Sequence, residues 1–237
     1  MDKGPRTERL VIVTGASKGV GEAAVRKLAL SEGCRVIAVA RDVKALEELA
    51  SHGGGRVEVG AIDLSQTSAA GAIKSLVAGR RVHALVHNAG LLHNAPMGLH
   101  QRADIESLYR VNVFAPLEIT QALVDELDGD PPGHIVHIGS MGGFQDSAKF
   151  PGLIAYSASK AALACMAQCL AEEFKGRGIR SNCLALGAVD TAMLREAFPG
   201  YKAPVSAEDM GNFVADFALY GHNLFNGKVL PVAVTTP

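Results

Sequence analysis

Short apolar runs alternate with longer amphipathic stretches along almost the whole chain. Runs rich in Val, Ile and Leu are predicted to form strands over residues 10–14, 35–40, 57–62, 84–87, 134–139, 180–186 and 228–232. Helices are predicted to follow six of them, over residues 20–31, 43–51, 66–77, 105–127, 156–175 and 207–219. A strand–helix–strand repeat builds a parallel sheet with right-handed crossovers, so that helices cover both of its faces. The pattern predicts an α/β protein with a mostly parallel, doubly wound, seven-stranded sheet.

The size and charge of the chain limit its organisation and its partners. The 237 residues fit one domain, and no linker, repeat or low-complexity segment divides them. The net charge is −1 and the Lys and Arg residues are scattered, so we expect no nucleic-acid partner. No apolar stretch reaches the roughly 20 residues that span a bilayer, and no signal peptide is apparent. We therefore expect a cytoplasmic protein with no membrane partner. Pro231 in the last predicted strand indicates an edge position.

The cysteines and histidines give no sign of a metal site. The four cysteines form no C-x-x-C pair, and Cys165 and Cys169 lie at helical spacing among Ala, Leu and Met. This spacing predicts that they are buried free thiols. His134 and His137 would point to opposite faces of a strand, so they could not chelate one ion. We expect no bound metal.

A glycine-rich loop follows the first predicted strand and opens the first predicted helix. Its three glycines have the spacing G-x3-G-x-G. Glycine permits a tight turn and close approach of the backbone, and the helix-terminal N–H groups can then bind a diphosphate. The candidate dinucleotide-binding residues of this loop are Gly15, Ser17, Lys18, Gly19, Val20 and Gly21.

Other interpretations of this loop are less favourable. Residues 15–19 also read G-x-S-x-G, the nucleophile elbow of α/β hydrolases. That elbow needs an oxyanion-hole loop from an earlier strand, and no strand is predicted before this one. A P-loop would need Gly-Lys-Ser/Thr, which the segment lacks. A glycine-rich turn without a ligand stays open on this segment alone.

The end of the second predicted strand bears on the choice between NAD and NADP. A site that selects NAD usually places an acidic residue there, to accept from the ribose 2′-OH. Ala40 occupies that place, Arg41 follows it, and Lys18 adds a second positive charge from the glycine loop. Two cations suit the 2′-phosphate of NADP. Asp42 opposes this, but it also reads as the N-cap of the next helix. NADP is therefore favoured over NAD.

Tyr156 and Lys160 lie four residues apart in a predicted helix, so their side chains share one face. An ammonium about 5 Å from a phenol, at an effective dielectric near 20, favours the phenolate by roughly 3 kcal/mol. That energy would lower the pKa of the phenol by about 2 units. A tyrosine tuned in this way exchanges protons near neutral pH. The spacing alone is weak evidence, because a packed Tyr beside a solvated Lys gives the same pattern.

Together these residues resemble the classical branch of the short-chain dehydrogenase/reductase family, over nearly the whole chain. Seven motifs occur in the family's order: the glycine loop at 14–21, Asp63, Asn88-Ala89-Gly90, Asn112, Ser140, the Tyr156/Lys160 pair and the segment 187–191. The resemblance implies a single Rossmann-type domain over residues 1–237. It also implies an oxidoreductase that interconverts a carbonyl and an alcohol with a nicotinamide cofactor. A homodimer or homotetramer built through the long helices is expected on the same ground.

The resemblance implies a role for each motif residue. Tyr156 would be the acid/base, Lys160 would lower its pKa and hold the nicotinamide ribose, and Ser140 would bind the substrate oxygen. Asn112 would position a water that relays protons to Lys160. The cofactor would be bound by the glycine loop, Arg41, Asp63, Leu64, Asn88, Ala89, Gly90, Tyr156, Lys160, Gly187, Val189 and Thr191.

Departures from the family pattern concern the substrate more than the chemistry. His87 stands where an Asn is common, Leu186 replaces a proline, and the interval from Ser140 to Tyr156 is longer. Apolar residues dominate the segments that should face the cleft, so we expect a small or medium apolar ketone or aldehyde, with 3-oxoacyl thioesters as one candidate. A cofactor-binding sensor without turnover and an NAD-dependent alcohol dehydrogenase stay open as alternatives. The apolar residues are Leu91, Leu92, Met97, Met141, Phe144, Phe150, Leu153, Met193, Phe198 and Tyr201.

Overall fold

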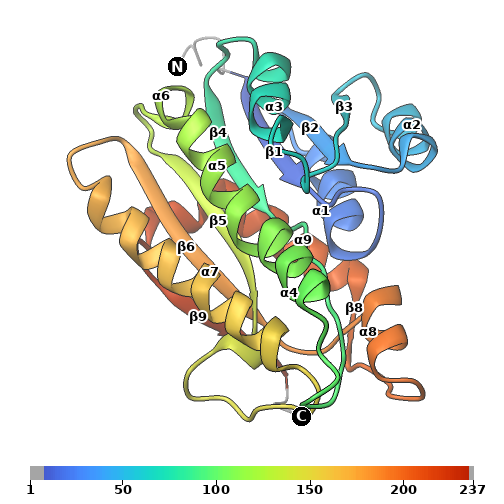
Figure 1. Ribbon diagram of the computed structural model, residues 1–237. Helices are drawn as coiled ribbons and strands as arrows, with labels where there is room; N and C mark the ends of the chain where they lie inside the picture. The colour runs from blue at the N-terminus through green and yellow to red at the C-terminus, as the bar shows by residue number, and fades with distance from the viewer. Residues whose placement is uncertain (1–7, 235–237) are drawn as a thin grey trace.

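A seven-stranded sheet forms the centre of the protein, in a computed structural model that describes residues 8–234 (Figure 1). Its strand order is β3-β2-β1-β4-β5-β6-β9, and every neighbouring pair is parallel. The predicted parallel, doubly wound sheet is confirmed. The strands are β1 (Arg9–Thr14), β2 (Cys34–Ala40), β3 (Val57–Ala61), β4 (Val82–His87), β5 (Gly133–Ser140), β6 (Ile179–Leu186) and β9 (Val229–Val232).

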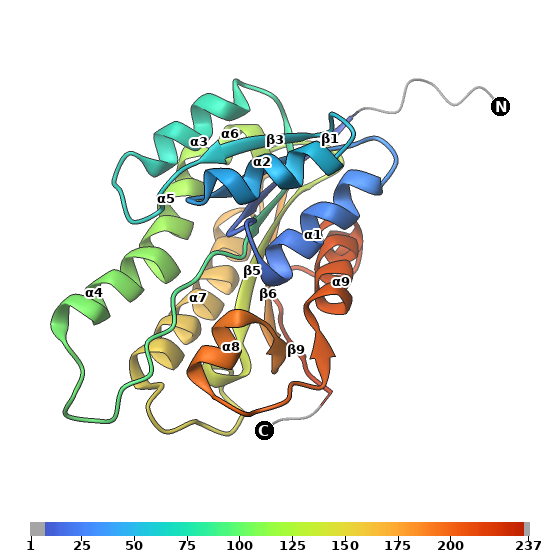
Figure 2. The same ribbon diagram turned by 90° about the vertical axis from the view of Figure 1, so that its right-hand side faces the viewer.

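Helices cover both faces of the sheet, and each face has its own apolar core (Figure 2). One core packs the sheet against α1 (Gly19–Leu30), α2 (Val43–His52) and α9 (Ala207–Tyr220). The other packs it against α3 (Ala69–Val77) and α5 (Ala115–Ala122), with α7 (Ile154–Glu173) beside them. The central strands are buried on both sides, which explains their continuous apolar runs. β9 pairs only with β6, so Pro231 lies on an edge strand as predicted.

The predicted helix over residues 105–127 is wrong as a single element. The segment contains α4 (Arg102–Tyr109), a π-helical turn η1 (Arg110–Phe114), α5, and the short α6 (Val124–Leu127). Pro116 lies in the first turn of α5. A proline has no N–H to donate to the carbonyl four residues earlier, here that of Asn112, and its ring crowds that carbonyl. The helix widens to a π turn at this position, where the backbone of Asn112 is released from the regular α pattern.

Three short elements beyond β6 were not predicted. α8 (Ala192–Ala197) follows the two-residue strand β7 (Val189–Asp190), which pairs with β8 (Val205–Ser206). Figure 2 shows α8 crossing the end of the sheet at which the parallel strands finish. The order of the strands reverses between β1 and β4, and in open α/β sheets such a point carries the ligand crevice.

Cys165 and Cys169 are free thiols as predicted, but the prediction that they are buried is wrong. Cys34 and Cys183 are buried, whereas Cys165 and Cys169 are exposed on the outer face of α7. Between residues 8 and 234, no group of three or more His, Cys, Asp or Glu side chains is arranged to hold a metal ion. Over the same residues, every helix is too short or too polar to cross a lipid bilayer.

Candidate active site

A cavity of about 870 Å³ lies at the carboxyl ends of the strands, within the size range of small-molecule sites. Seventeen of the nineteen predicted site residues line it, and Gly21 and Asn112 do not. The structure thus brings together segments from every part of the chain, while the roles of these residues stay predictions. The lining residues are Gly15, Ser17, Lys18, Gly19, Val20, Arg41, Asp63, Leu64, Asn88, Ala89, Gly90, Ser140, Tyr156, Lys160, Gly187, Val189 and Thr191.

The glycine loop packs so closely that side chains are excluded from it. Gly15 has φ +68°, and a Cβ there would lie 2.7 Å from the Cα of Ala89. A Cβ on Gly21 would lie 2.3 Å from Nδ2 of Asn88, so Gly21 serves packing rather than the cavity wall. Among the described residues, no side chain caps the N-terminus of α1, whereas Asp42 caps α2 as predicted. The loop therefore fits a dinucleotide. The N–H groups at the start of α1 are not capped by a side chain, and the glycines of the loop leave room for a phosphate beside them.

Asn88 holds the glycine loop against the end of β4. Its Nδ2 donates to the carbonyl oxygens of Thr14 and Gly15 at 2.9 and 3.1 Å. The hydroxyl of Thr14 accepts from the backbone N–H groups of Asn88 and Ala89, both at 3.1 Å. Thr14 was not predicted as a site residue, although its place between the first strand and Gly15 was a signal for it. These bonds fix the spacing between the two loops that flank the point of strand reversal.

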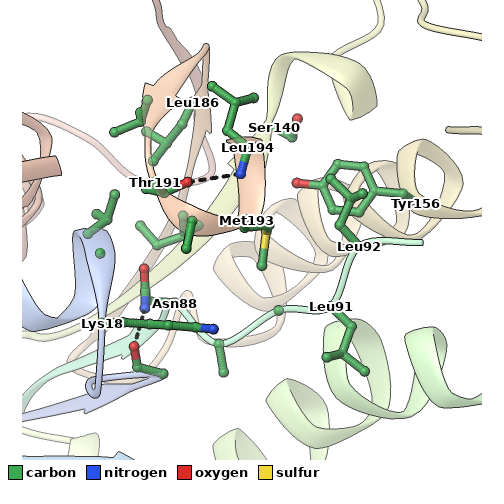
Figure 3. A pocket seen from close by; sticks show the side chains of 18 of the residues that line it. Lys18, Asn88, Leu91, Leu92, Ser140, Tyr156, Leu186, Thr191, Met193 and Leu194 are labelled. Carbon is green, nitrogen blue, oxygen red and sulfur yellow. Dashed lines mark hydrogen bonds between the residues drawn. The ribbon is translucent and has the colours of Figure 1, made fainter. Parts of the chain in front are cut away.

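Two cations and one carboxylate border the far end of the cavity. Lys18 extends into the cavity below Asn88 (Figure 3), and Arg41 lies exposed at the end of β2. Asp63 lies near Arg41 and accepts from the backbone N–H of Ser65 at 2.9 Å, and this bond lowers the pKa of its carboxyl. Asp63 therefore stays ionised at neutral pH and offsets part of the positive charge of Arg41.

Tyr156 and Ser140 present their hydroxyls to the same part of the cavity (Figure 3). The ring of Tyr156 is buried against Leu153, Leu108 and Ala155. Burial raises the pKa of Tyr156, and its hydrogen bond with Ser140 opposes this only in part. The prediction that the pKa of Tyr156 falls below its usual value is therefore wrong for the protein without cofactor. The ammonium lies 5.9 Å from the centre of the ring, and burial of the phenol dominates.

Lys160 is buried beneath the cavity floor and is 4% exposed. Its Nζ donates to the carbonyl oxygen of Ile138 at 2.8 Å, and burial lowers its pKa to about 8. A Cβ on Gly90 would approach this Nζ to 3.2 Å, so glycine at that position leaves the ammonium accessible from the cavity. Lys160 is thus a cation in a dry site, where a hydroxyl-bearing ligand could bond to it.

Asn112 is buried outside the cavity and holds one of its walls. Its Oδ1 accepts from the N–H of Leu91 at 2.8 Å, and its Nδ2 donates to the carbonyl of Leu91 and to the hydroxyl of Ser159, both at 3.0 Å. The side chain therefore joins the segment after β4 to α7, and both of its N–H donors are used by protein groups. Pro116 also deprives the backbone carbonyl of Asn112 of the N–H donor that a regular α-helix would supply, so the predicted role of Asn112 in proton relay stays a prediction.

The other half of the cavity is apolar, as predicted. Eight of the ten expected apolar residues line it, whereas Phe144 and Met97, the latter 81% exposed, do not. Sequence reasoning missed the contribution of α8, because that helix was not predicted. Thr191 caps α8 by accepting from the N–H of Leu194 at 3.3 Å. The additional lining residues from this region are Asp190, Ala192, Leu194 and Arg195, the last of them paired with Asp190 at 2.5 Å.

Comparisons with known proteins agree with this architecture. The sequence profile of the short chain dehydrogenase family matches residues 9–202. A short-chain type dehydrogenase/reductase of Sinorhizobium fredii is 34% identical over 189 residues, which cover 79% of this chain and 73% of that protein. A fatty acyl-CoA reductase of Mycobacterium tuberculosis is 30% identical over 211 residues, covering 85% and 71%. A dehydrogenase from Beutenbergia cavernae, solved with NADP at low occupancy, superimposes with a TM-score of 0.84 at 30% identity, covering 96% of both chains. The chain belongs to the short-chain dehydrogenase/reductase family of oxidoreductases.

Proposed function

We propose that this protein is an NADPH-dependent reductase of apolar ketones or aldehydes, which it converts to alcohols with Tyr156 as the acid. One observation carries the proposal: the hydroxyls of Tyr156 and Ser140 meet in the apolar half of a cavity whose other half is a glycine-lined dinucleotide cradle. A nicotinamide cofactor, when bound, supplies the hydride for carbonyl reduction. The protein's part is to position the carbonyl and to deliver a proton to its oxygen.

The raised pKa of Tyr156 suits reduction. At neutral pH the phenol keeps its proton, so it can donate one to a substrate oxygen as negative charge develops there. The Ser140 hydroxyl, beside Tyr156, would donate a second hydrogen bond to the same oxygen. The buried Lys160 ammonium favours the phenolate that remains after proton transfer, because the two groups share one face of α7. The apolar walls exclude water from the reacting atoms.

The main test is to mix the protein with NADPH and a panel of aliphatic and aryl ketones, aldehydes and 3-oxoacyl thioesters. The expected result is substrate-dependent loss of NADPH absorbance, with the best rates on uncharged, apolar compounds. The similarity to a fatty acyl-CoA reductase is a reason to include long acyl carbonyls. Tight NADPH binding with no turnover across the panel would instead indicate a cofactor-binding sensor. Turnover of secondary alcohols with NAD alone would indicate the dehydrogenase alternative.

Lys18 and Arg41 support the choice of NADPH over NADH, since both line the end of the cavity beyond the glycine loop. Replacing Lys18 or Arg41 with alanine should raise the KM for NADPH by about tenfold each, the loss of one charged hydrogen bond to a phosphate. The KM for NADH should change by less than about twofold, because NADH has no 2′-phosphate for them to bind.

Arg26→Ala provides the control for this cofactor prediction. Arg26 is also an exposed cation of α1, but it pairs with Glu22 at 2.8 Å and lies outside the cavity. Its removal should leave both KM values unchanged. Equal effects of the Arg41 variant on NADPH and NADH would contradict the assignment of the 2′-phosphate site, and NAD would then become the favoured cofactor.

We also propose a homo-oligomer formed through α5 and α7. Their outer faces expose Phe114 at the start of α5, Leu117 and Ile154, which are 45%, 44% and 54% accessible, and the uncharged Cys165 and Cys169 lie on the same side of α7. Neighbouring exposed apolar side chains of this kind are typical of protein–protein interfaces. Light scattering after gel filtration should give a dimer or tetramer mass, and Leu117→Lys should shift it towards the monomer.

A further inference from the structure

Three separate segments meet at the substrate end of the cavity. They are the segment after β4 (residues 88–101), the segment before α7 (residues 144–153) and the segment that contains α8 (residues 191–204). The side chain of Asn94 donates from Nδ2 to the carbonyl of Ala197 at 3.1 Å, which ties the first segment to the end of α8. The N–H of Ala95 donates to the carbonyl of Gly152 at 3.0 Å, which ties the first segment to the second.

An aromatic contact completes this junction. The rings of Phe150 and Phe198 meet edge to face, with their centroids 6.3 Å apart and their planes at 67°. Both rings line the cavity, and both pack against the cluster that buries the ring of Tyr156. The pair therefore belongs to the substrate half of the cavity and joins two residues 48 positions apart in the sequence. Edge-to-face pairs of this kind stabilise contacts beyond their buried area.

The backbone of the segment before α7 packs tightly against the segment after β4 at this junction. Gly152 has φ +81°, and a Cβ there would lie 2.0 Å from Oδ1 of Asn94. Only glycine lets these two segments approach so closely. The packing fixes Phe150, at the end of the longer interval between Ser140 and Tyr156, against the α8 segment. The additional residues of that interval thus deliver a ring to the cavity wall.

We propose that Phe150 and Phe198 form the end wall of the substrate half of the cavity and limit the length of the apolar group carried by an accepted carbonyl compound, with Asn94 holding this wall closed. The inference rests on the proposed reductase function and names its substrate class: ketones or aldehydes with one apolar chain that must end before the two rings. A longer chain could bind only where the rings separate, which would break their contact.

The test is a series of 2-alkanones of increasing length, reduced with NADPH by the wild type and by Phe150→Ala and Phe198→Ala. In each variant the preferred chain should lengthen, and the ratio of kcat/KM for long over short ketones should rise by about tenfold or more, the discrimination that a few methylene contacts provide. This ratio does not depend on the fraction of folded enzyme. Asn94→Asp, which keeps the shape but loses the donor, should raise the ratio by about threefold, as expected for one hydrogen bond.

Phe144→Ala is the matched control, because Phe144 lies in the same segment as Phe150 but outside the cavity. It should keep the wild-type length profile. Unchanged profiles in the Phe150 and Phe198 variants, or an equal shift in the Phe144 variant, would overturn the proposal. If no ketone oxidises NADPH, the rise in melting temperature produced by 2-alkanols with NADP gives the same length profile by binding. A length profile that shifts in the two variants then supports the Phe150–Phe198 end wall even though the reductase function fails. If no 2-alkanol raises the melting temperature, the proposed end wall is overturned together with the reductase function.

Discussion

Replacing Tyr156 with phenylalanine is expected to lower kcat/KM for carbonyl reduction by about 10³-fold, within the range that a positioned general acid contributes. The variant loses only the phenol oxygen, and among the described residues that hydroxyl has one protein partner, Ser140. NADPH should still bind, because the glycine loop and the cations at the far end of the cavity are untouched. The measurement is steady-state NADPH oxidation with the best ketone of the panel, beside NADPH affinity by fluorescence titration.

Tyr109→Phe is the control for the loss of a phenol oxygen. Tyr109 packs against the same apolar cluster as Tyr156 but does not line the cavity. Both variants should change the free energy of unfolding by less than about 1 kcal/mol, the net value of one hydrogen bond. A Tyr156→Phe protein that binds NADPH and reduces ketones at the wild-type rate would remove the basis of the mechanism.

The parts of the site that sequence reasoning located are those whose signal is local. The residues next to Gly15, which has φ +68° and precedes a helix, and next to Asn88, which follows a buried strand, were enough to predict that both belong to the site. Parallel strands then bring these places to one edge of the sheet. The π turn at Asn112 also had a local signal in Pro116, four residues later, which the apolar periodicity of the segment obscured.

The parts that could not be predicted depend on contacts between distant segments. α8 has six residues, too few for a periodic pattern, and its position follows from the β7–β8 pairing and from Asn94. The contact between Phe150 and Phe198 has no sequence signature. The pKa of Tyr156 was predicted from a pair spacing, but its direction is set by burial among residues from other elements. Helical spacing among apolar residues likewise could not show which face of α7 lacks a neighbour within the chain.

Acidification from pH 7.5 to 4.5 is expected to remove at least roughly 5 kcal/mol from the free energy of unfolding, a large part of the total stability of a single domain. Burial lowers the pKa of His87 and His134 to about 3 and holds that of His137 well below its usual range. A lowered histidine pKa means that the unfolded chain binds more protons once the pH falls below about 6.5. His87 and His134 then each cost about 1.4 kcal/mol of stability per pH unit, and His137 acts in the same direction. Urea unfolding at several pH values measures the slope.

The surroundings of these histidines explain why they stay neutral in the fold. His87 and His137 stack with ring centroids 5.1 Å apart, so a proton on either would face the other ring, and Nδ1 of His137 has no partner among the described residues. His134 donates from Nδ1 to the carbonyl of Ala218 and accepts from the Asn182 amide, which uses both nitrogens of the neutral ring. His83 and His222, whose pKa values burial also lowers, pack near it and add to the effect.

A single substitution can assign part of this acid sensitivity to one buried ring. His87→Gln keeps a polar group near the position of Nε2, which now lies 2.9 Å from the hydroxyl of Thr120, but it removes one titrating site. The slope of the free energy of unfolding against pH should fall by about 1.4 kcal/mol per pH unit between pH 6 and 4.5. His52→Gln, at an exposed ring of α2, is the matched control. A wild-type stability that stays constant from pH 6.5 to 5 would contradict this prediction. It would mean that the buried rings bind protons in the folded state as readily as they do in the unfolded chain.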